Sequence, residues 1–393
     1  MIRELTADCV HCGFCLPTCP TYVLWSEEMD SPRGRIHLMD ARLDGALSLN
    51  ATVATHFDRC LGCMACVSSC PSGVQYDRLI EATRAAVEHE YRRPRGERLV
   101  RSLLFATLPY PRRLGWALRL APLGRAVPLP RRLRPLVQIA PTWRSTERLP
   151  SVIAAQGRRT GRVGLLTGCV QSVVFGDVNT ASARVLAAAG YDVSVPRQGC
   201  CGALSAHAGR EAESERFTGR LRSAFAESEP IVVNAAGCGS HLKDRGLPTL
   251  ELSEALAGTE LPELHPLELT VAYQDSCHLR HAQRLPAAWL SVLEQIPGLH
   301  IVEPAEQDLC CGSAGIYNVV QPEAARELGD RKAGHVLASG AQAYASANPG
   351  CLVQVSQALR RAKQPLPALH PIELVDASIR GLPARQLRAT ARR

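Results

Sequence analysis

Long hydrophobic runs are missing from this 393-residue sequence. No stretch reaches the roughly eighteen uninterrupted apolar residues of a membrane-spanning helix. The first residues, MIRELTADC, also lack the apolar core of a secretion signal. We therefore expect a cytoplasmic protein, at most in peripheral contact with the inner face of the cell membrane.

Two kinds of binding motif are also missing. No Gly-x-Gly-x-x-Gly follows any candidate strand, so we expect no nucleotide or flavin site in this chain. The formal net charge is +8, but no helix-turn-helix, zinc finger or ladder of aromatic and basic residues accompanies it. These absences argue against a nucleic-acid partner and against a DNA-binding redox sensor.

Cysteine, by contrast, is abundant. The chain has 16 cysteines, and they cluster in short-spaced groups. In a large chain without an export signal such groups indicate metal ligands rather than disulfides. The length also exceeds one hydrophobic core, which predicts two or three domains.

Eight of the cysteines form two runs, each ending in Cys-Pro, with the spacing of bacterial ferredoxins. In two-cluster proteins the fourth cysteine of each run binds the cluster of the other run. We therefore predict two [4Fe-4S] clusters, the first held by Cys9, Cys12, Cys15 and Cys70 and the second by Cys60, Cys63, Cys66 and Cys19. Paired zinc sites are the alternative, but zinc explains neither the third Cys-x-x-Cys step nor the final Cys-Pro.

Helices are expected around these runs, so residues 1–91 are interpreted as a helical, two-cluster ferredoxin-type domain. Ser31 and Pro32 are a helix-start signal, and apolar residues from Ile36 to Leu47 recur at three- and four-residue steps after it. Residues 79–90 have a similar helical pattern. Arg33 and Arg35 either lie beside a cluster and raise its potential or belong to a solvated loop.

Residues 92–160 are interpreted as a linker rich in arginine and proline. Glu97 is the only acidic residue between positions 92 and 137. The segment either rests on anionic lipid or wraps the neighbouring domains with its arginine stems on apolar surface. Its prolines exclude one long amphipathic helix.

The rest of the chain is an internal repeat, which we divide into units at 161–265 and 266–380. Each unit has a strand ending at a cysteine, a Cys-Cys-Gly string after a second strand, and a third strand ending at another cysteine. Alternating strands and helices predict parallel sheets with their sites at the carboxyl ends of the strands. The expected fold is therefore α+β and multidomain, a helical ferredoxin domain followed by two duplicated α/β units.

The repeated cysteines form two matched sets of four, namely Cys169, Cys200, Cys201 and Cys238, and Cys277, Cys310, Cys311 and Cys351. Each set could bind a further iron-sulfur cluster or a metal, or could be a buried group of thiols retained for packing. His241, His278 and His281 lie close to these cysteines, and we interpret them as structural residues rather than ligands.

Paired Cys-Cys-Gly units behind a two-cluster ferredoxin region resemble the iron-sulfur subunit of glycolate oxidase (glycolate dehydrogenase). The relatives of that family include one of the subunits of anaerobic glycerol-3-phosphate dehydrogenase and subunits of heterodisulfide reductase. The resemblance spans nearly the whole chain, including CVHCGFCLPTCPTY at 9–22, SPRGRIHLM at 31–39 and CCGSAGIY at 310–317.

This resemblance implies an electron-transfer subunit without catalytic residues of its own. Partner subunits would carry FAD and oxidise glycolate to glyoxylate, and this chain would pass the electrons towards a quinone. A subunit of a glycerol-3-phosphate or lactate dehydrogenase, and a thiol reductase like heterodisulfide reductase, remain alternatives. In the heterodisulfide reductase relatives the last cysteine of each unit belongs to a Cys-x-x-Cys pair. Here Ala235 and Asn348 occupy the first position of that pair, which counts against the reductase.

Overall fold

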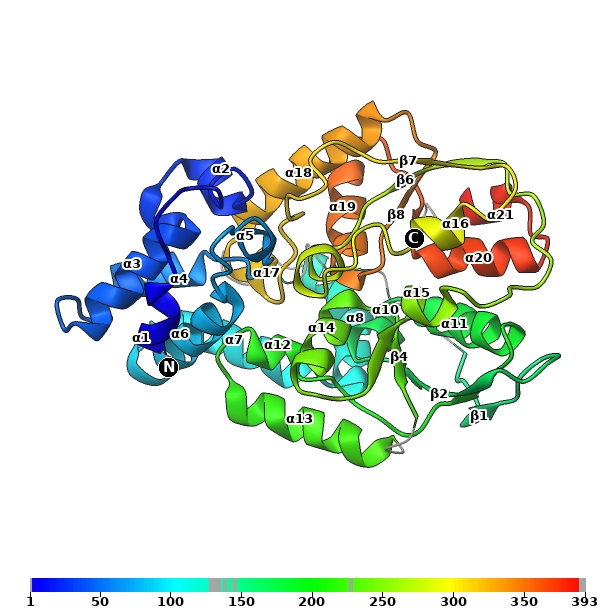
Figure 1. Cartoon of the computed structure of the whole chain (residues 1–393), viewed down its shortest axis with the longest axis horizontal. Helices are drawn as coiled ribbons and strands as arrows, with labels where there is room; N and C mark the ends of the chain where they lie inside the picture. The colour runs from blue at the N-terminus through cyan, green and yellow to red at the C-terminus, as the bar shows by residue number, and fades with distance from the viewer. Residues whose placement is uncertain are drawn as a thin grey trace.

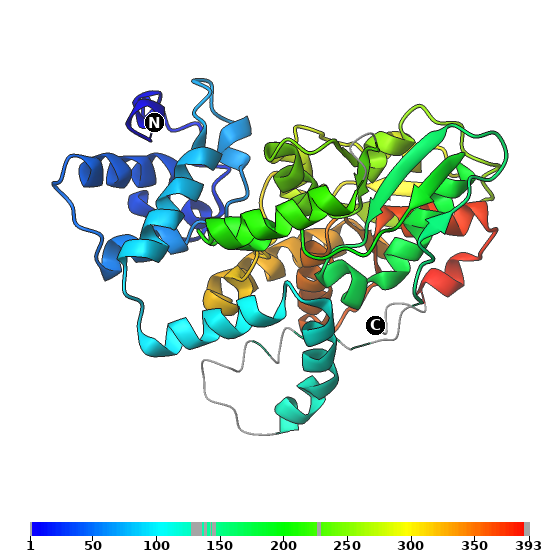
Figure 2. The same ribbon diagram turned by 90° about the horizontal axis from the view of Figure 1, so that it is seen from below.

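The structure is a computed structural model that describes residues 2–126, 136, 140–141, 143, 147–225 and 229–388. A helical region at the N-terminus lies beside two α/β units, and the two helices that follow it run along those units (Figures 1 and 2). This arrangement confirms the predicted fold, a helical ferredoxin-like region followed by two α/β units. Within the described part of the chain, no helix is long and apolar enough to cross a membrane.

Residues 2–90 fold into short helices joined by loops. They are α1 (Ile2–Ala7), α2 (Pro20–Trp25), the 3-10 turn η1 (Glu28–Asp30), α3 (Pro32–Leu43), α4 (Ala51–Asp58), α5 (Ala65–Ser68) and α6 (Tyr76–Glu90). Both helices expected from the sequence are present as α3 and α6. Ser31 caps α3, because its hydroxyl accepts a hydrogen bond from the Gly34 amide at 3.0 Å, and Pro32 occupies the first turn.

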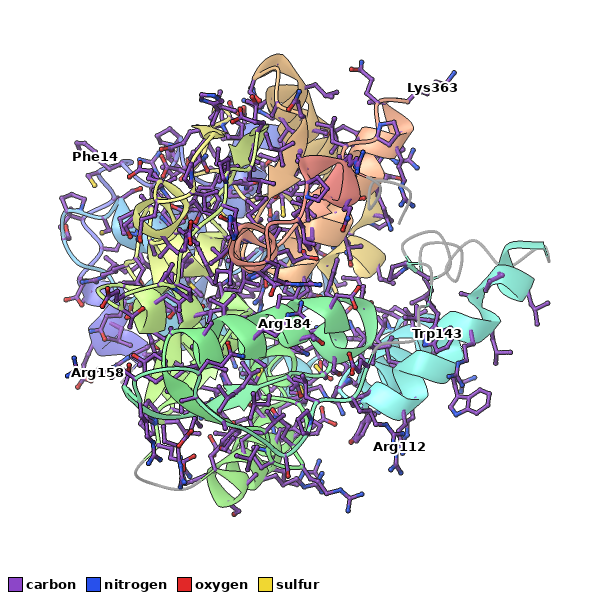
Figure 3. All side chains as sticks on the ribbon, turned by 90° about the vertical axis from the view of Figure 1, so that its right-hand side faces the viewer. Phe14, Arg112, Trp143, Arg158, Arg184 and Lys363 are labelled. Carbon is purple, nitrogen blue, oxygen red and sulfur yellow. The ribbon has the colours of Figure 1, made fainter. Side chains whose placement is uncertain are left out.

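Two helices follow, α7 (Arg95–Thr107) and α8 (Pro111–Ala126), and the break between them falls at a proline, as expected. Helix α7 packs on the α/β units, where Leu104 and Phe105 share an apolar cluster with Ile316. Helix α8 packs on α10 of the first unit through its first half, where Leu114 and Leu118 are buried, and its C-terminal end projects away from these units (Figures 2 and 3). This segment therefore packs on the α/β units along most of its length and leaves them only at the end of α8.

The first α/β unit has a mixed sheet with the strand order β1-β3-β2-β4-β5. Only β1 runs antiparallel to its neighbour, and it comes from the segment that we assigned to the linker. The strands are β1 (Val152–Ile153), β2 (Gly161–Leu166), β3 (Tyr191–Ser194), β4 (Ile231–Val233) and β5 (Thr249–Glu251). The helices are α10 (Val170–Val174), α11 (Gly176–Ala188), α12 (Ala203–Ala206), α13 (Glu211–Ala224), α14 (Ala236–Asp244) and α15 (Leu252–Leu256).

The second unit repeats this plan with the parallel order β7-β6-β8-β9, so β6 corresponds to β2 at the centre of the sheet. Its strands are β6 (Leu269–Tyr273), β7 (Leu299–Val302), β8 (Ala343–Ala345) and β9 (Ala368–Leu369). Its helices are the π-helix η2 (His278–Ala282), α16 (Leu290–Leu293), α17 (Tyr317–Val320), α18 (Pro322–Ala338), α19 (Pro349–Arg361) and α20 (Pro371–Ile379), and α21 (Ala384–Arg388) follows.

The expectation that the first and third strands of each unit end at a cysteine was wrong, because these strands end several residues earlier. Strands β2 and β6 stop at Leu166 and Tyr273, before Cys169 and Cys277. Likewise β4 and β8 stop at Val233 and Ala345, and Cys238 and Cys351 lie in the first turns of α14 and α19. The chain leaves each sheet before its cysteine because the loop or helix that carries the thiol begins immediately after the strand.

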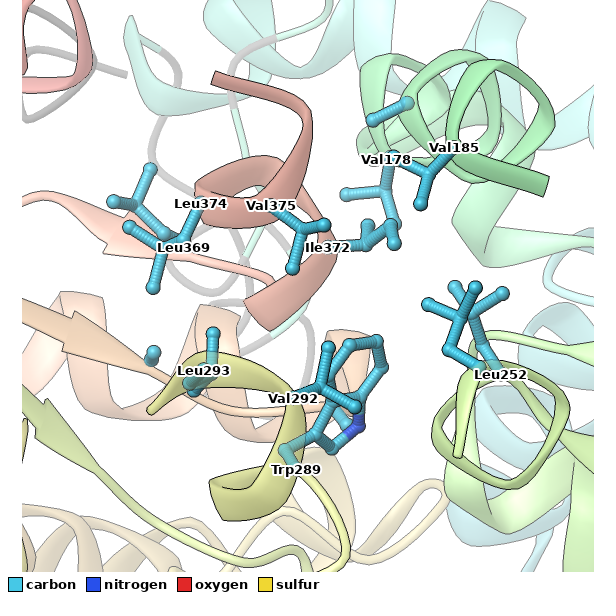
Figure 4. Packing of buried hydrophobic residues seen from close by; sticks show 14 of the residues in the cluster. Val178, Val185, Leu252, Trp289, Val292, Leu293, Leu369, Ile372, Leu374 and Val375 are labelled. Carbon is cyan, nitrogen blue, oxygen red and sulfur yellow. The ribbon is translucent and has the colours of Figure 1, made fainter. Parts of the chain in front are cut away.

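One apolar core runs through both units. Val178 and Val185 of α11 face Ile372 and Val375 of α20, with Trp289, the N-cap residue of α16, packed beneath them (Figure 4). Arg184 of α11 adds a bidentate ion pair to Asp376 of α20, with distances of 2.8 and 2.6 Å. The two units are therefore held together as one packed body.

Candidate iron-sulfur centres

The second cysteine run surrounds a cavity together with the last cysteine of the first run. Cys19, Cys60, Cys63 and Cys66 all line this cavity, which also borders Arg35 and Tyr76. Gly62 and Met64 have positive φ angles of 63° and 62°, so the loop curls between the thiols. This set of four thiols around one space fits a [4Fe-4S] cluster, whose ligands are thiolates.

Two positively charged side chains, Arg35 and Arg84, lie near Cys60 at this cavity. Burial raises the pKa of the Cys60 thiol, but the guanidinium groups of Arg35 and Arg84 outweigh it, so the net pKa is lowered. The Gly62 amide and the Tyr76 hydroxyl also approach the Cys60 sulfur, at 3.3 and 3.7 Å. Both effects stabilise a thiolate and would raise the potential of a cluster bound there.

Arg35 provides this charge from inside the protein. Only 1% of its surface is exposed, and it donates to the His56 carbonyl at 2.7 Å and to Asp30 at 3.3 Å. Arg33 is part-exposed and pairs with Glu28 at 2.7 Å. Arg35 is therefore a buried side chain that lines the four-thiol cavity, and it does not belong to a solvated loop.

The first run lies nearer the surface. Burial raises the pKa of the Cys9 thiol, and the nearby thiols of Cys70 and Cys12 raise it further. Burial likewise raises the pKa of Cys15 to about 11. Cys12 itself is exposed, and in the same loop Val10 and Phe14 are 68% and 66% exposed. Cys9 therefore has Cys70 as a neighbour, and this group reaches the protein surface.

In the first α/β unit the four thiols form a continuous group, in which Cys169, Cys200 and Cys201 are buried and Cys238 is half-buried. The Cys169 and Cys200 sulfurs are 3.5 Å apart, and those of Cys201 and Cys238 are 3.1 Å apart. Beside this group, the ring of Tyr110 from the segment before α8 meets Phe217 edge-on at 5.8 Å. The linker, through Tyr110, therefore packs over the first set of thiols.

In the second unit the thiols are arranged in the same order. The pKa of Cys310 is raised well above its usual range, first by its hydrogen bond with Cys277 and then by burial, and Cys311 has both Cys310 and Cys351 as hydrogen-bonding neighbours. Gly312 has a φ of +87°, and a Cβ at that position would lie 2.8 Å from the Ala325 carbonyl oxygen. The vicinal pair therefore requires glycine after it.

Ala235 and Asn348, which stand where the reductase relatives have a further cysteine, are the N-cap residues of α14 and α19. The Asn348 amide points at the Cys351 sulfur, with a distance of 3.5 Å. In the second unit the replaced position thus still faces its thiol.

The two repeated units differ in one respect that the sequence did not indicate. Cys310 of the second unit shares an apolar cluster with Leu61 and Cys63 of the ferredoxin region and with Tyr317. Burial and then the charge of Cys310 raise the pKa of Cys63. The second thiol set is therefore a direct neighbour of the cavity lined by Cys63.

The nearby histidines have protein partners. Ser68 and the Asp308 carbonyl contact His281 at 2.7 and 3.2 Å, and Ser214 contacts His241 at 3.2 Å. His278 Nδ1 lies 3.6 Å from the Cys277 sulfur. Across the described ranges, no group of three or more histidine, cysteine or acidic side chains is arranged to hold a single metal ion.

Two protein families match parts of this chain. Residues 6–74 match the family described as 4Fe-4S dicluster domain, and residues 163–243 and 271–356 each match the family described as cysteine-rich domain. The fold and these matches define an iron-sulfur protein with paired cysteine-rich repeats.

The relatives define the family more narrowly. The chain is 34% identical to the probable glycolate oxidase iron-sulfur subunit of Bacillus subtilis, over 90% of this chain and 89% of the relative. It is also 34% identical to the glycolate oxidase iron-sulfur subunit of Escherichia coli, over 96% of both chains. A lactate utilization protein A from Oceanobacillus iheyensis is 26% identical over 56% of this chain and 98% of its own length. The chain therefore belongs to the family of glycolate oxidase iron-sulfur subunits, as the sequence resemblance predicted.

Proposed function

We propose that this chain is the iron-sulfur electron-transfer subunit of a flavin-dependent glycolate dehydrogenase complex. FAD-bearing partner subunits would oxidise glycolate to glyoxylate, and this chain would carry the electrons from flavin towards a quinone. The proposal rests chiefly on the four-thiol cavity next to the second unit, and the similarity to glycolate oxidase subunits over most of the chain supports it.

We propose crossed ligation for the two clusters. Cys19 groups with the second run at the cavity, and Cys70 is a neighbour of Cys9. We assign Cys9, Cys12, Cys15 and Cys70 to the first cluster, and Cys60, Cys63, Cys66 and Cys19 to the second. When bound, such clusters supply one-electron carriers, which accept the electrons of a two-electron flavin one at a time.

We infer the direction of electron transfer from the different solvent exposure of the two cysteine runs. The loop of the first run presents Val10 and Phe14 to solvent, whereas the second set is enclosed by Leu61, Cys310 and Tyr317. We assign the docking of the flavoprotein to the exposed loop, because an apolar surface beside a cluster allows a partner to approach it closely. The second set then leads inward to the repeated units.

The repeated thiol sets are candidates for further sites. A cluster or metal held by Cys277, Cys310, Cys311 and Cys351 would lie next in line after the second cluster. The matching first set, Cys169, Cys200, Cys201 and Cys238, is covered by Tyr110 and Phe217, so it would lie off that line.

Helix α8 suits contact with the inner membrane surface. It exposes Trp116, Leu120 and Leu123, at 63%, 57% and 67%, and between them it carries only basic charged side chains. Figure 3 shows Arg112 at the start of this helix. Arginine attracts anionic lipid, and tryptophan and leucine insert at its surface. Reduced sedimentation of a Trp116→Glu variant with anionic vesicles would support this contact, and unchanged sedimentation would refute it.

Cluster content and crossed ligation are tested with ligand variants. Anaerobically purified protein should hold about eight irons in the ferredoxin region. Cys19→Ser should alter the paramagnetic signal of the cluster bound by Cys60, Cys63 and Cys66, and Cys70→Ser should alter the other signal. If Cys19→Ser instead changed the signal of the Cys9 set, crossed ligation would be wrong, and binding of zinc without iron would remove the cluster assignment altogether.

The partner is tested by co-purification. The proposal predicts FAD-containing subunits that bleach on addition of glycolate. A single partner that responds to lactate or glycerol 3-phosphate but not to glycolate would replace this substrate with the alternative.

A further inference from the structure

A second pocket opens where the ferredoxin region, α7 and both α/β units meet. Six of its lining residues matter here, and we call the space that they line the junction pocket: Cys60, Leu61, Leu204, His207, His278 and Tyr317. It has about 610 Å³ of atom-free space, including its open mouth. Because Cys60 also lines the four-thiol cavity, the two spaces share a wall.

Three polar atoms in this pocket have no hydrogen-bond partner among the residues described. They are the hydroxyl oxygen of Tyr317, Nε2 of His278 and Nε2 of His207. Tyr317 is only 3% exposed. The two imidazole rings lie 5.2 Å apart. Buried polar groups are nearly always satisfied, so these atoms are available to bond a water molecule or a ligand in the pocket.

The arginine side chains around the pocket already have partners in the protein, which argues against an anionic ligand. Arg84 donates to the His207 carbonyl, and Arg93 and Arg101 pair with Asp58 and Glu97. An anion would have to displace these partners. The groups without a partner are instead one hydroxyl and two imidazole nitrogens, next to apolar walls formed by Leu61 and Leu204.

We propose that the junction pocket binds the head group of a quinone and is where the electrons leave the chain. This inference rests on the proposed function, since the flavoprotein must supply the electrons. The Tyr317 hydroxyl and a histidine N–H would donate to the carbonyl oxygens of the quinone, and the leucines would flank its ring.

Reduction of the quinone to hydroquinone requires two electrons and two protons. Each quinone would take two electrons, one at a time, from a cluster that Cys60 helps to hold, and the flavoprotein would reduce that cluster again after each step. The quinone also takes two protons and leaves as hydroquinone. Glu81 is part-exposed, and its Oε1 lies 3.2 Å from Nδ1 of His207, so these two side chains connect the pocket with solvent protons.

Binding of decylubiquinone to the full chain tests the proposal without any turnover. Calorimetric titration should give a Kd that rises at least about tenfold in Leu204→Trp, because the larger ring fills the pocket. Tyr317→Phe should raise the Kd about threefold to tenfold, because it removes one hydrogen bond. The matched control Leu103→Trp, at an exposed position of α7, should bind as the unchanged protein does.

A kinetic experiment distinguishes failure of the quinone site from failure of the proposed electron-transfer function. After reduction with dithionite, the chain should be oxidised by decylubiquinone at least about tenfold more slowly in Leu204→Trp. Oxidation by ferricyanide, which needs no pocket, should be unchanged. Equal binding and equal quinone oxidation in Leu204→Trp and the unchanged chain would overturn the junction pocket as the quinone site. If the glycolate flavoprotein still reduced the chain in that case, the proposed function would stand.

Discussion

Replacing Glu251 by glutamine should stabilise the protein above neutral pH. Glu251 ends β5, is 1% exposed, and accepts a hydrogen bond from Gln283 of the second unit. Burial raises its pKa from about 4.5 to about 7. Below pH 4.5 the carboxyl is protonated in both the folded and the unfolded chain, so it has no effect on the pH dependence of stability there.

Between these two pKa values the unfolded chain releases the proton while the folded chain keeps it. Stability therefore falls as the pH rises through this window, and the loss is complete above about pH 7. The pKa difference of about 2.5 units corresponds to about 3 kcal/mol at about 1.36 kcal/mol per unit. Glutamine is never ionised, and its carbonyl oxygen can still accept from Gln283. The variant should therefore gain up to about 3 kcal/mol at about pH 8 and almost nothing at about pH 4.5.

Hydrogen exchange of the β4 and β5 amides, read by mass spectrometry, measures this gain as a difference in opening free energy at each pH. Glu263→Gln is the control, because that carboxylate is exposed. A gain that stayed constant with pH, or one that grew towards acid pH, would refute the reasoning.

Two further substitutions test the sites themselves. Arg35→Met should lower the reduction potential of the cluster proposed beside Cys60, since it removes a buried positive charge. Its cost in stability should stay below the about 3–5 kcal/mol of a fully broken buried ion pair, because Asp30 keeps its 2.7 Å ion pair with Arg59. An unchanged potential in a redox titration followed by paramagnetic resonance would contradict the assignment. Gly312→Ala should destabilise the fold by more than the roughly 1–2 kcal/mol of a left-handed backbone, since its Cβ would lie 2.8 Å from a carbonyl oxygen. Gly340→Ala, with a φ of +69° and open space around it, isolates the backbone cost, so equal thermal shifts for the two variants would count against the packing argument.

Local signals in the sequence were sufficient to predict several features of the fold. The Ser31-Pro32 signal places the start of α3 because capping and the fixed φ of proline act on neighbouring residues. The repeated Cys-Cys-Gly strings likewise revealed the duplication, since each string belongs to one α/β unit. The proline between α7 and α8 broke the helix as expected.

The arrangement of the sites could not be predicted in the same way. Both units carry the same string, so no local pattern distinguishes the unit whose cysteines meet Cys63. That contact depends on the packing of Leu61 against Leu309 and Tyr317, which lie far apart in the sequence. The burial of Arg35 is a similar case, because Asp30 and the His56 carbonyl enclose it only in the folded chain.

The central claim is that this chain conducts electrons and does not oxidise the substrate, and one stopped-flow measurement on the assembled complex tests it. In a Cys63→Ser complex with normal flavin content, glycolate should still bleach the flavin at the unchanged rate, because hydride transfer to flavin requires no cluster. Reduction of a quinone analogue by the same complex should be abolished. Failure of the flavin to bleach would contradict the account, since it would give this chain a direct part in oxidising the substrate.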